Sequence, residues 1–83
     1  MDFQLTKHAQ FVLAERRISV AWVERVLSAP ALTHPDGIDP ALEHRLGRIV
    51  EYGDRVLRVI LDPSAEPVRV VTAFFDRTMK DAL

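Results

Sequence analysis

The chain has 83 residues, enough for one domain with a small core, and its hydrophobic fraction of 48% excludes the disordered class. It has no cysteine, which excludes a disulfide framework and a thiolate-ligated metal and fits a reducing compartment. The formal net charge of −1 argues against a nonspecific nucleic-acid coat, which needs a large basic excess, but leaves room for a local basic site.

The start of the chain lacks the basic region of a signal peptide, and no apolar run approaches the ~18 residues of a membrane span. We therefore expect a cytoplasmic protein that makes no membrane contact.

Two short helices are predicted in the first third of the chain. Thr6 is a suitable N-cap for a helix over Lys7–Arg16, and Ser19 for a second over Val20–Ser28. Apolar residues recur in both at helical spacing, so each helix has one face to bury. Asp2–Leu5 precedes them as a small strand or only an entry segment, and its pairing stays open.

The segment Ala31–Leu42 is expected to be a long exposed loop. It contains Pro35, Gly37 and Pro40 among polar residues, which is typical of turns. Loops of this length in a compact domain often carry function.

Three antiparallel strands are predicted next, over His44–Tyr52, Arg55–Asp62 and Val68–Phe75. Gly53 and Asp54 between the first two indicate a two-residue hairpin, because glycine readily adopts a positive φ. The predicted fold is α+β, with two N-terminal helices packed on a three- to four-stranded antiparallel sheet. Asp76–Leu83 is expected to be a polar tail with at most a fraying helical turn.

A tight hairpin fixes the strand register. If Tyr52 faces Arg55, Arg48 faces Val59; the next turn would place Leu61 opposite Val68. The face under the helices then carries Leu46, Val50, Leu57, Val59, Leu61, Val68, Val70 and Phe74, with Arg48 and Thr72 as polar exceptions. The other face carries Arg45, Ile49, Glu51, Val56, Arg58, Ile60, Arg69, Val71, Ala73 and Phe75. Being half apolar and half charged, it would be an open cleft or a contact surface.

No phosphate-binding loop, dinucleotide motif or zinc spacing occurs in the sequence. His34 and His44 lie ten positions apart across the predicted loop. Two solvated loop histidines are favoured over a metal site there, and we expect neither a metal nor a cofactor.

His8 lies in the first turn of the first helix, where the helix dipole disfavours an imidazolium. A histidine held neutral there could serve as a general acid or base. The simpler interpretation is a partly buried histidine with a backbone partner.

Arginines on adjacent predicted strands form a second group of candidates. Arg45, Arg48 and Arg58 could hold phosphate, because the guanidinium fork matches phosphate oxygens. The alternative is that Arg45 pairs with Asp62 and that the stem of Arg58 covers apolar surface. Thr72 could hydrogen-bond a phosphate or a catalytic side chain, or be present for its strand propensity alone.

Several stretches together indicate a family. The sequence resembles the small bacterial proteins grouped as domain-of-unknown-function family 4258, over about Leu5 to Arg77. The matching stretches are Leu5–Ala9, Glu15–Ser19, Val23–Pro30, Gly47–Arg48, Leu57–Ile60 and Val71–Asp76. That family is similar to the RelE-like nucleases of toxin–antitoxin pairs.

The resemblance implies an RNA endonuclease toxin that needs no metal and uses the RNA 2′-OH as nucleophile. By position, His8 would be the acid or base, Arg16 and Arg58 would bind phosphate, and Thr72 would orient the reacting group. Arg48 would add to RNA binding, and Arg45 is a further RNA-binding candidate from its place on the same predicted face as Arg58. RNA and a cognate antitoxin would be the partners.

The alternative function is a non-catalytic interaction module, a homodimer or adaptor, on the same scaffold. The endonuclease hypothesis requires His8 and at least two arginines to converge in one groove. The interaction hypothesis requires the mixed sheet face or an edge strand to be covered by another chain.

Overall fold

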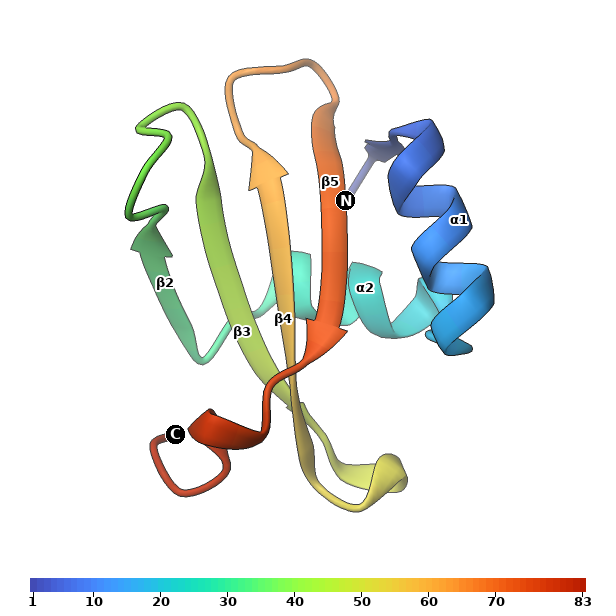
Figure 1. Cartoon of the computed structure of the whole chain (residues 1–83), viewed down its shortest axis with the longest axis vertical. Helices are drawn as coiled ribbons and strands as arrows, with labels where there is room; N and C mark the ends of the chain where they lie inside the picture. The colour runs from blue at the N-terminus through green and yellow to red at the C-terminus, as the bar shows by residue number, and fades with distance from the viewer.

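The computed structural model describes residues 1–83 and has an α+β fold with one five-stranded sheet. In chain order the elements are β1 (Phe3–Leu5), α1 (Lys7–Arg16), α2 (Val20–Ser28), β2 (Leu32–Pro35), β3 (Glu43–Ile49), β4 (Arg55–Asp62) and β5 (Val68–Phe75). Short 3-10 turns cover Val50–Tyr52 and Arg77–Met79. The strand order is β1-β5-β4-β3-β2; α1 lies beside β5 and α2 crosses behind the sheet (Figure 1).

The two helices have the predicted bounds and the predicted caps. The Thr6 hydroxyl oxygen accepts a hydrogen bond from the Ala9 N–H at 3.0 Å, and the Ser19 hydroxyl accepts one from Ala21 at 3.1 Å. Arg17 ends α1 in the left-handed region at φ 56°. Neither helix is both long enough and apolar enough to cross a bilayer.

The three predicted antiparallel strands are present as β3, β4 and β5, but the predicted sheet of three to four strands is too small, because β1 and β2 add one strand to each edge. β1 pairs with β5 in parallel, with Phe3 opposite Val68. β2 pairs with β3 inside the segment expected to be a loop. Pro35 is the last residue of β2 at the sheet edge, where a missing N–H is tolerated.

The hairpin between β3 and β4 is longer than predicted, and this changes which side chains share a face. Ile49 rather than Tyr52 faces Arg55, a shift of three positions (52 − 49 = 3). Residues 50–54 form the connection, in which Gly53 and Asp54 have φ of 66° and 56°. An odd shift exchanges the two faces of a strand, so the predicted sidedness of Arg45 and Arg48 is reversed.

The predicted register between β4 and β5 is wrong, because β5 contains a bulge. Thr72 faces Ile60 whereas Val70 faces Leu61, so Val71 between them has no partner. Beyond the bulge, Ala73 faces the helices and Thr72 faces away from them. The predicted covered position of Phe74 is likewise wrong, since it pairs with Arg58 on the opposite face.

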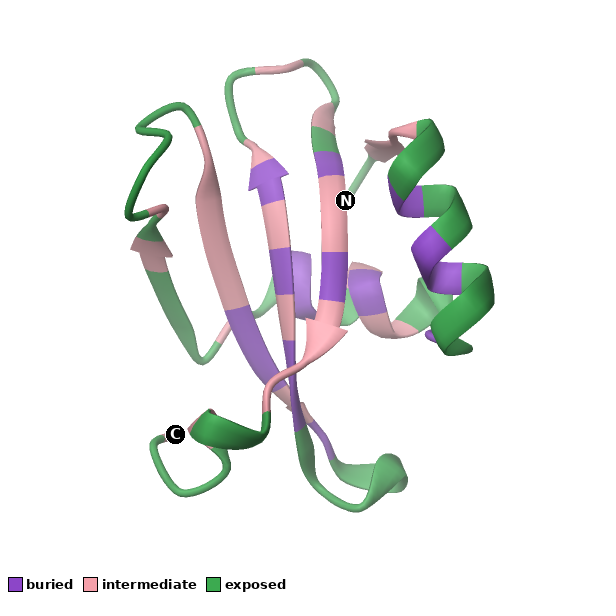
Figure 2. Cartoon of the chain, in the orientation of Figure 1, coloured by how far each residue is buried: buried purple, intermediate pink, exposed green.

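The core lies between the helices and one face of the sheet. It is formed by Ala9, Leu13, Ile18, Val23, Val26 and Leu27 from the helical half, and by Ile49, Leu57, Val59, Leu61, Val70 and Ala73 from the strands. Along α1 and β4, buried segments alternate with more exposed ones, as expected for elements with one covered face (Figure 2). At Gly47 a Cβ would lie 3.3 Å from the nearest Val26 methyl, so glycine lets α2 approach β3 closely.

We call the opposite side of the sheet the outer face. By the observed registers it carries His34, His44, Leu46, Arg48, Val56, Arg58, Ile60, Thr72 and Phe74. The C-terminal segment lies in front of this face at one end of the sheet (Figure 1). Arg48 binds that segment by donating to the carbonyls of Lys80 and Leu83. The rest of the outer face has no helix over it.

Candidate functional site

Arg58 is the centre of a polar cluster on the outer face. Its Nη1 lies 2.9 Å from Nε2 of His34 and 2.8 Å from Nδ1 of His44. Its Nε donates to Oδ2 of Asp76 at 2.9 Å. The Arg58 side chain is only 12% exposed, so these contacts are partly shielded from water.

The hydrogen bonds define the protonation of both imidazoles. A guanidinium can only donate, so the ring nitrogens that face Arg58 must accept. The other nitrogen of His34 lies 2.8 Å from the Pro35 carbonyl, and that of His44 lies 2.6 Å from Oδ1 of Asp36. Each of these contacts needs a ring N–H, so the network assigns two neutral imidazoles. Their ring centroids are 4.8 Å apart.

Strand pairing brings the two histidines to the arginine. His34 in β2 lies directly opposite His44 in β3. Leu46 of β3 lies opposite Arg58, which makes His44 a diagonal neighbour of Arg58 on the same face. The cluster therefore draws on three adjacent strands and depends on edge strand β2 being in place.

Asp36 orients His44 from the turn that follows β2. The N–H of Asp39, the His44 imidazole and the N–H of Ile38 lower the pKa of the Asp36 carboxyl to about 2. Asp36 is therefore ionised at ordinary pH, and its carboxylate accepts the hydrogen bond from Nε2 of His44.

Asp76 orients Arg58 from the other side, directly after β5. Its Oδ1 accepts from the Thr78 hydroxyl at 2.6 Å and from the Thr78 N–H at 3.0 Å. The Thr78 hydroxyl and then Arg58 hold the pKa of Asp76 below its ordinary value. The carboxylate is 13% exposed and fixes the orientation of the guanidinium.

His8 does not belong to this cluster. It is exposed on α1, and α1 packs its buried residues against the core side of the sheet. Arg58 projects from the other side. The convergence of His8 with strand arginines is therefore absent, and the form of the endonuclease hypothesis that is centred on His8 is wrong.

The predicted RNA-binding arginines make separate structural contacts. Arg16 donates to the Ala73 carbonyl at 2.9 Å, and Arg45 donates to Glu43 and to the Leu27 carbonyl at the end of α2. Arg48 donates to the Asp54 carbonyl and to the C-terminal segment. Of the predicted residues, Arg58, Thr72 and Arg48 share the outer face, and only Arg58 is in the cluster.

The prediction that His34 and His44 are solvated loop residues is wrong. Both lie on strands and both point to Arg58. Asp36 and Asp76 were also missed as members of the site. The pattern His34-x-Asp36 was the available signal, but linking it to Arg58 needs the β2–β3–β4 register.

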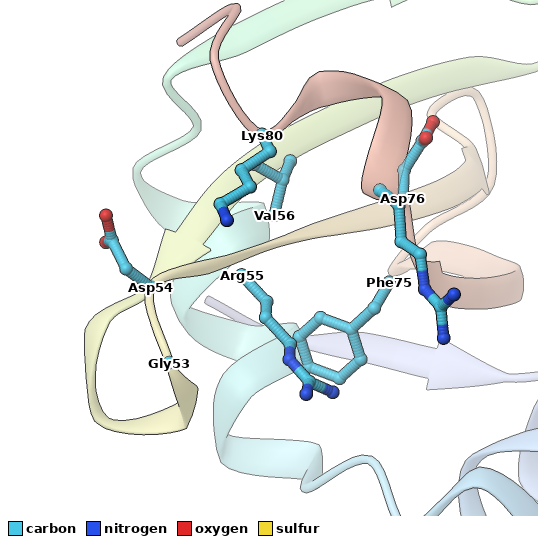
Figure 3. Close-up of a pocket in the computed structure, with 8 residues that line it drawn as sticks. Gly53, Asp54, Arg55, Val56, Phe75, Asp76 and Lys80 are labelled. Atoms are coloured by element: carbon cyan, nitrogen blue, oxygen red, sulfur yellow. The ribbon is translucent and has the colours of Figure 1, made fainter.

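Two hollows lie next to the cluster. The larger, of about 540 Å³, shares Asp76 with it and is also lined by Gly53, Asp54, Arg55, Val56, Phe75, Arg77 and Lys80. Figure 3 shows this hollow along the first residues of β4. The smaller, of about 240 Å³, shares His34 and is bounded by the turn after β2 and by Pro63.

Fold and site together define an α+β protein whose sheet presents an arginine–histidine–aspartate cluster on the face away from its helices. A family model described as "Domain of unknown function (DUF4258)" matches residues 5–75, and the chain belongs to that family. No curated protein and no solved structure matches the chain.

Proposed function

We propose that this protein is a metal-independent RNA endonuclease of the toxin type, and that Arg58, His34 and His44 form its catalytic centre. The observation that carries the proposal is the single guanidinium nitrogen shared by two neutral imidazoles. The similarity to RelE-like toxins that we expect for this family implies the same chemistry.

The first step of the proposed reaction is RNA binding at Arg58. Oxygens of a phosphodiester take the two Nη1 N–H groups that now contact His34 and His44, because an anion is a better acceptor than an imidazole nitrogen. This releases both ring nitrogens beside the bound phosphate. The guanidinium stays oriented by Asp76 and stabilises the charge of the phosphorane.

Cleavage then needs one base and one acid. One imidazole accepts the 2′-OH proton while the 2′-oxygen forms a bond to phosphorus. The other imidazole, having taken up a proton from solvent, donates it to the 5′-oxygen as the phosphorus–5′-oxygen bond breaks. The products are a 2′,3′-cyclic phosphate and a free 5′-hydroxyl, and no redox partner is needed.

We assign the two proton-transfer roles to His44 and His34 in place of His8. Asp36 accepts from Nε2 of His44 and would stabilise the imidazolium formed in the reaction, which favours His44 as the base. Thr72 lies on the same face and keeps its proposed role of orienting the bound phosphate.

The test is RNA cleavage by wild type, His44→Gln, His34→Gln and His8→Gln. We expect losses of about 100-fold or more for the first two, the range for a lost general acid or base. His8→Gln should cleave like wild type, and cleavage by wild type should persist with a metal chelator. Wild-type inactivity, or equal cleavage by wild type and His44→Gln, would refute the proposal.

A non-catalytic interaction module is the second candidate, and the free edge of β2 favours it. One side of β2 has no strand partner, and Leu32 in it is 37% exposed. Such an edge can accept a strand from an antitoxin or from a second copy of the chain. Light scattering of the purified protein gives its oligomeric state, and the RNA cleavage assay gives its activity. A monomer that cleaves RNA supports the nuclease, and a stable dimer that does not cleave RNA supports the interaction module.

A further inference from the structure

The larger hollow beside the cluster has a surplus of positive charge. Three of its lining residues are cations, namely Arg55, Arg77 and Lys80, and none of them forms a salt bridge. Its two carboxylates are already engaged, since Asp76 pairs with Arg58 at 2.9 Å and Asp54 lies 3.5 Å from Arg48.

The three cations come from two segments that meet where β5 ends. The Asp76 N–H donates to the Val56 carbonyl at 2.9 Å and holds the C-terminal segment against β4. This contact brings Arg77 and Lys80 into the lining of the same hollow as Arg55. In Figure 3 the Lys80 side chain lies on one side of the β4 ribbon and Arg55, beside Phe75, on the other, with Asp54 and Asp76 towards opposite ends.

Aromatic side chains support one wall of the hollow. The Arg55 guanidinium lies 4.7 Å from the centre of the Tyr52 ring, and Tyr52 packs on Phe75 with 5.0 Å between ring centres. Stacking of this kind keeps the Arg55 stem in place while its N–H groups remain available. A volume of about 540 Å³ is within the range of ligand sites, roughly 300–1,000 Å³.

We propose that this hollow is a phosphate subsite for single-stranded RNA, holding a backbone phosphate next to the one bound at Arg58. The identity of the ligand rests on the proposed function. The position is argued from Asp76, which lines the hollow and also accepts a hydrogen bond from Arg58, so the hollow begins where the Arg58 cluster ends. Unpaired cations beside an aromatic wall are the features that bind single-stranded nucleic acid without reading its sequence.

The test measures binding separately from cleavage. The probe is a fluorescently labelled, 2′-O-methylated RNA of about ten nucleotides, long enough to span such a site and unable to be cut because its 2′-oxygen is blocked. We expect Lys80→Gln and Arg77→Gln each to raise Kd about 5- to 10-fold at low salt and to reduce the salt slope by roughly 0.7. Lys7→Gln is the matched control, because Lys7 and Lys80 are the only lysines and Lys7 lies on α1.

The outcomes separate the subsite from the enzyme. If wild type does not bind the probe, or if Lys80→Gln and Arg77→Gln bind it as tightly as Lys7→Gln, the subsite is refuted. If binding depends on these residues but wild type leaves unmodified RNA intact, the subsite stands and the nuclease function fails. If wild type cleaves RNA and binding is insensitive to them, the nuclease stands and the subsite fails.

Discussion

At the scale of single residues, the site depends on the shape of one guanidinium. Arg58 donates through Nη1 to two imidazoles and through Nε to a carboxylate, in directions that only a planar fork supplies. A lysine ammonium has the same charge, but its single nitrogen cannot donate in the same directions to all of these acceptors. Arg58 is therefore expected to be sensitive to a substitution that preserves charge.

We expect Arg58→Lys to lower the free energy of unfolding by about 1–3 kcal/mol, because it leaves partly buried acceptors without donors. Urea denaturation monitored by circular dichroism measures this. Arg69→Lys is the control, since Arg69 is exposed and reaches Asp62 only at 4.0 Å. Equal stability of the two variants would show that the shape of the guanidinium does not matter to the fold.

Asp36 gives the site a dependence on acid pH. Its pKa falls from 3.8 to about 2 in the folded chain, so its charged form stabilises the folded state. That contribution is complete above pH 3.8 and is lost as the pH falls towards 2.

We expect Asp36→Asn to be less stable than wild type at neutral pH, and the difference to shrink as the pH falls through this window. Urea titrations of both proteins at neutral pH and near pH 2.5 measure their free energies of unfolding. The difference between the two proteins at neutral pH is the reference for the difference near pH 2.5. A difference that is the same at both pH values would mean that the Asp36 charge does not stabilise the fold.

At the scale of elements, the approach of α2 to β3 depends on a glycine. The nearest Val26 methyl would lie 3.3 Å from a Cβ at Gly47, closer than ordinary van der Waals contact. β3 also carries His44 and pairs with β2, so this packing supports the strand that positions half of the site.

We expect Gly47→Val to lower the free energy of unfolding by about 1–3 kcal/mol through overpacking against α2. Gly37→Val is a matched control, because nothing lies within 4 Å of a Cβ at Gly37, and its effect should stay within about 0.5 kcal/mol. Thermal and urea unfolding of both variants decide the matter. Equal losses would show that contact with Val26 is not the cause.

At the scale of the whole molecule, the two sides of the sheet carry different parts of the structure. The helices and the apolar core occupy one side, and the Arg58 cluster occupies the other. The C-terminal segment covers one end of the outer face, held by Arg48 through backbone carbonyls. Because this segment carries Arg77 and Lys80, its position also shapes the larger hollow.

We expect Arg48→Gln to loosen the C-terminal segment while leaving the sheet intact. Amide hydrogen exchange should become faster in residues 76–83 and stay unchanged in β4 and β5, because local opening costs less than global unfolding. Arg69→Gln, on the exposed part of β5, is the control. Unchanged exchange in residues 76–83 would mean that Arg48 does not hold the segment.

The sequence alone determined the two helices, the positions of β4 and β5, and the α+β class. These depend on local signals: the caps Thr6 and Ser19, helical spacing of apolar residues, and β-branched runs between turns. It also identified Arg58 as a candidate. Each of these features is encoded within about ten neighbouring residues, so reasoning from local physics reaches them.

Only the tertiary structure decided the strand registers, the two edge strands and therefore the site. The longer hairpin and the bulge at Val71 each changed which residues face outward, and a short pattern does not specify either. His34 and His44 meet Arg58 because three strands pair side by side, and His8 is excluded because α1 packs on the opposite side. Side chains far apart in sequence converge only when strand pairing fixes their face, and the free energy of that pairing comes from the whole core.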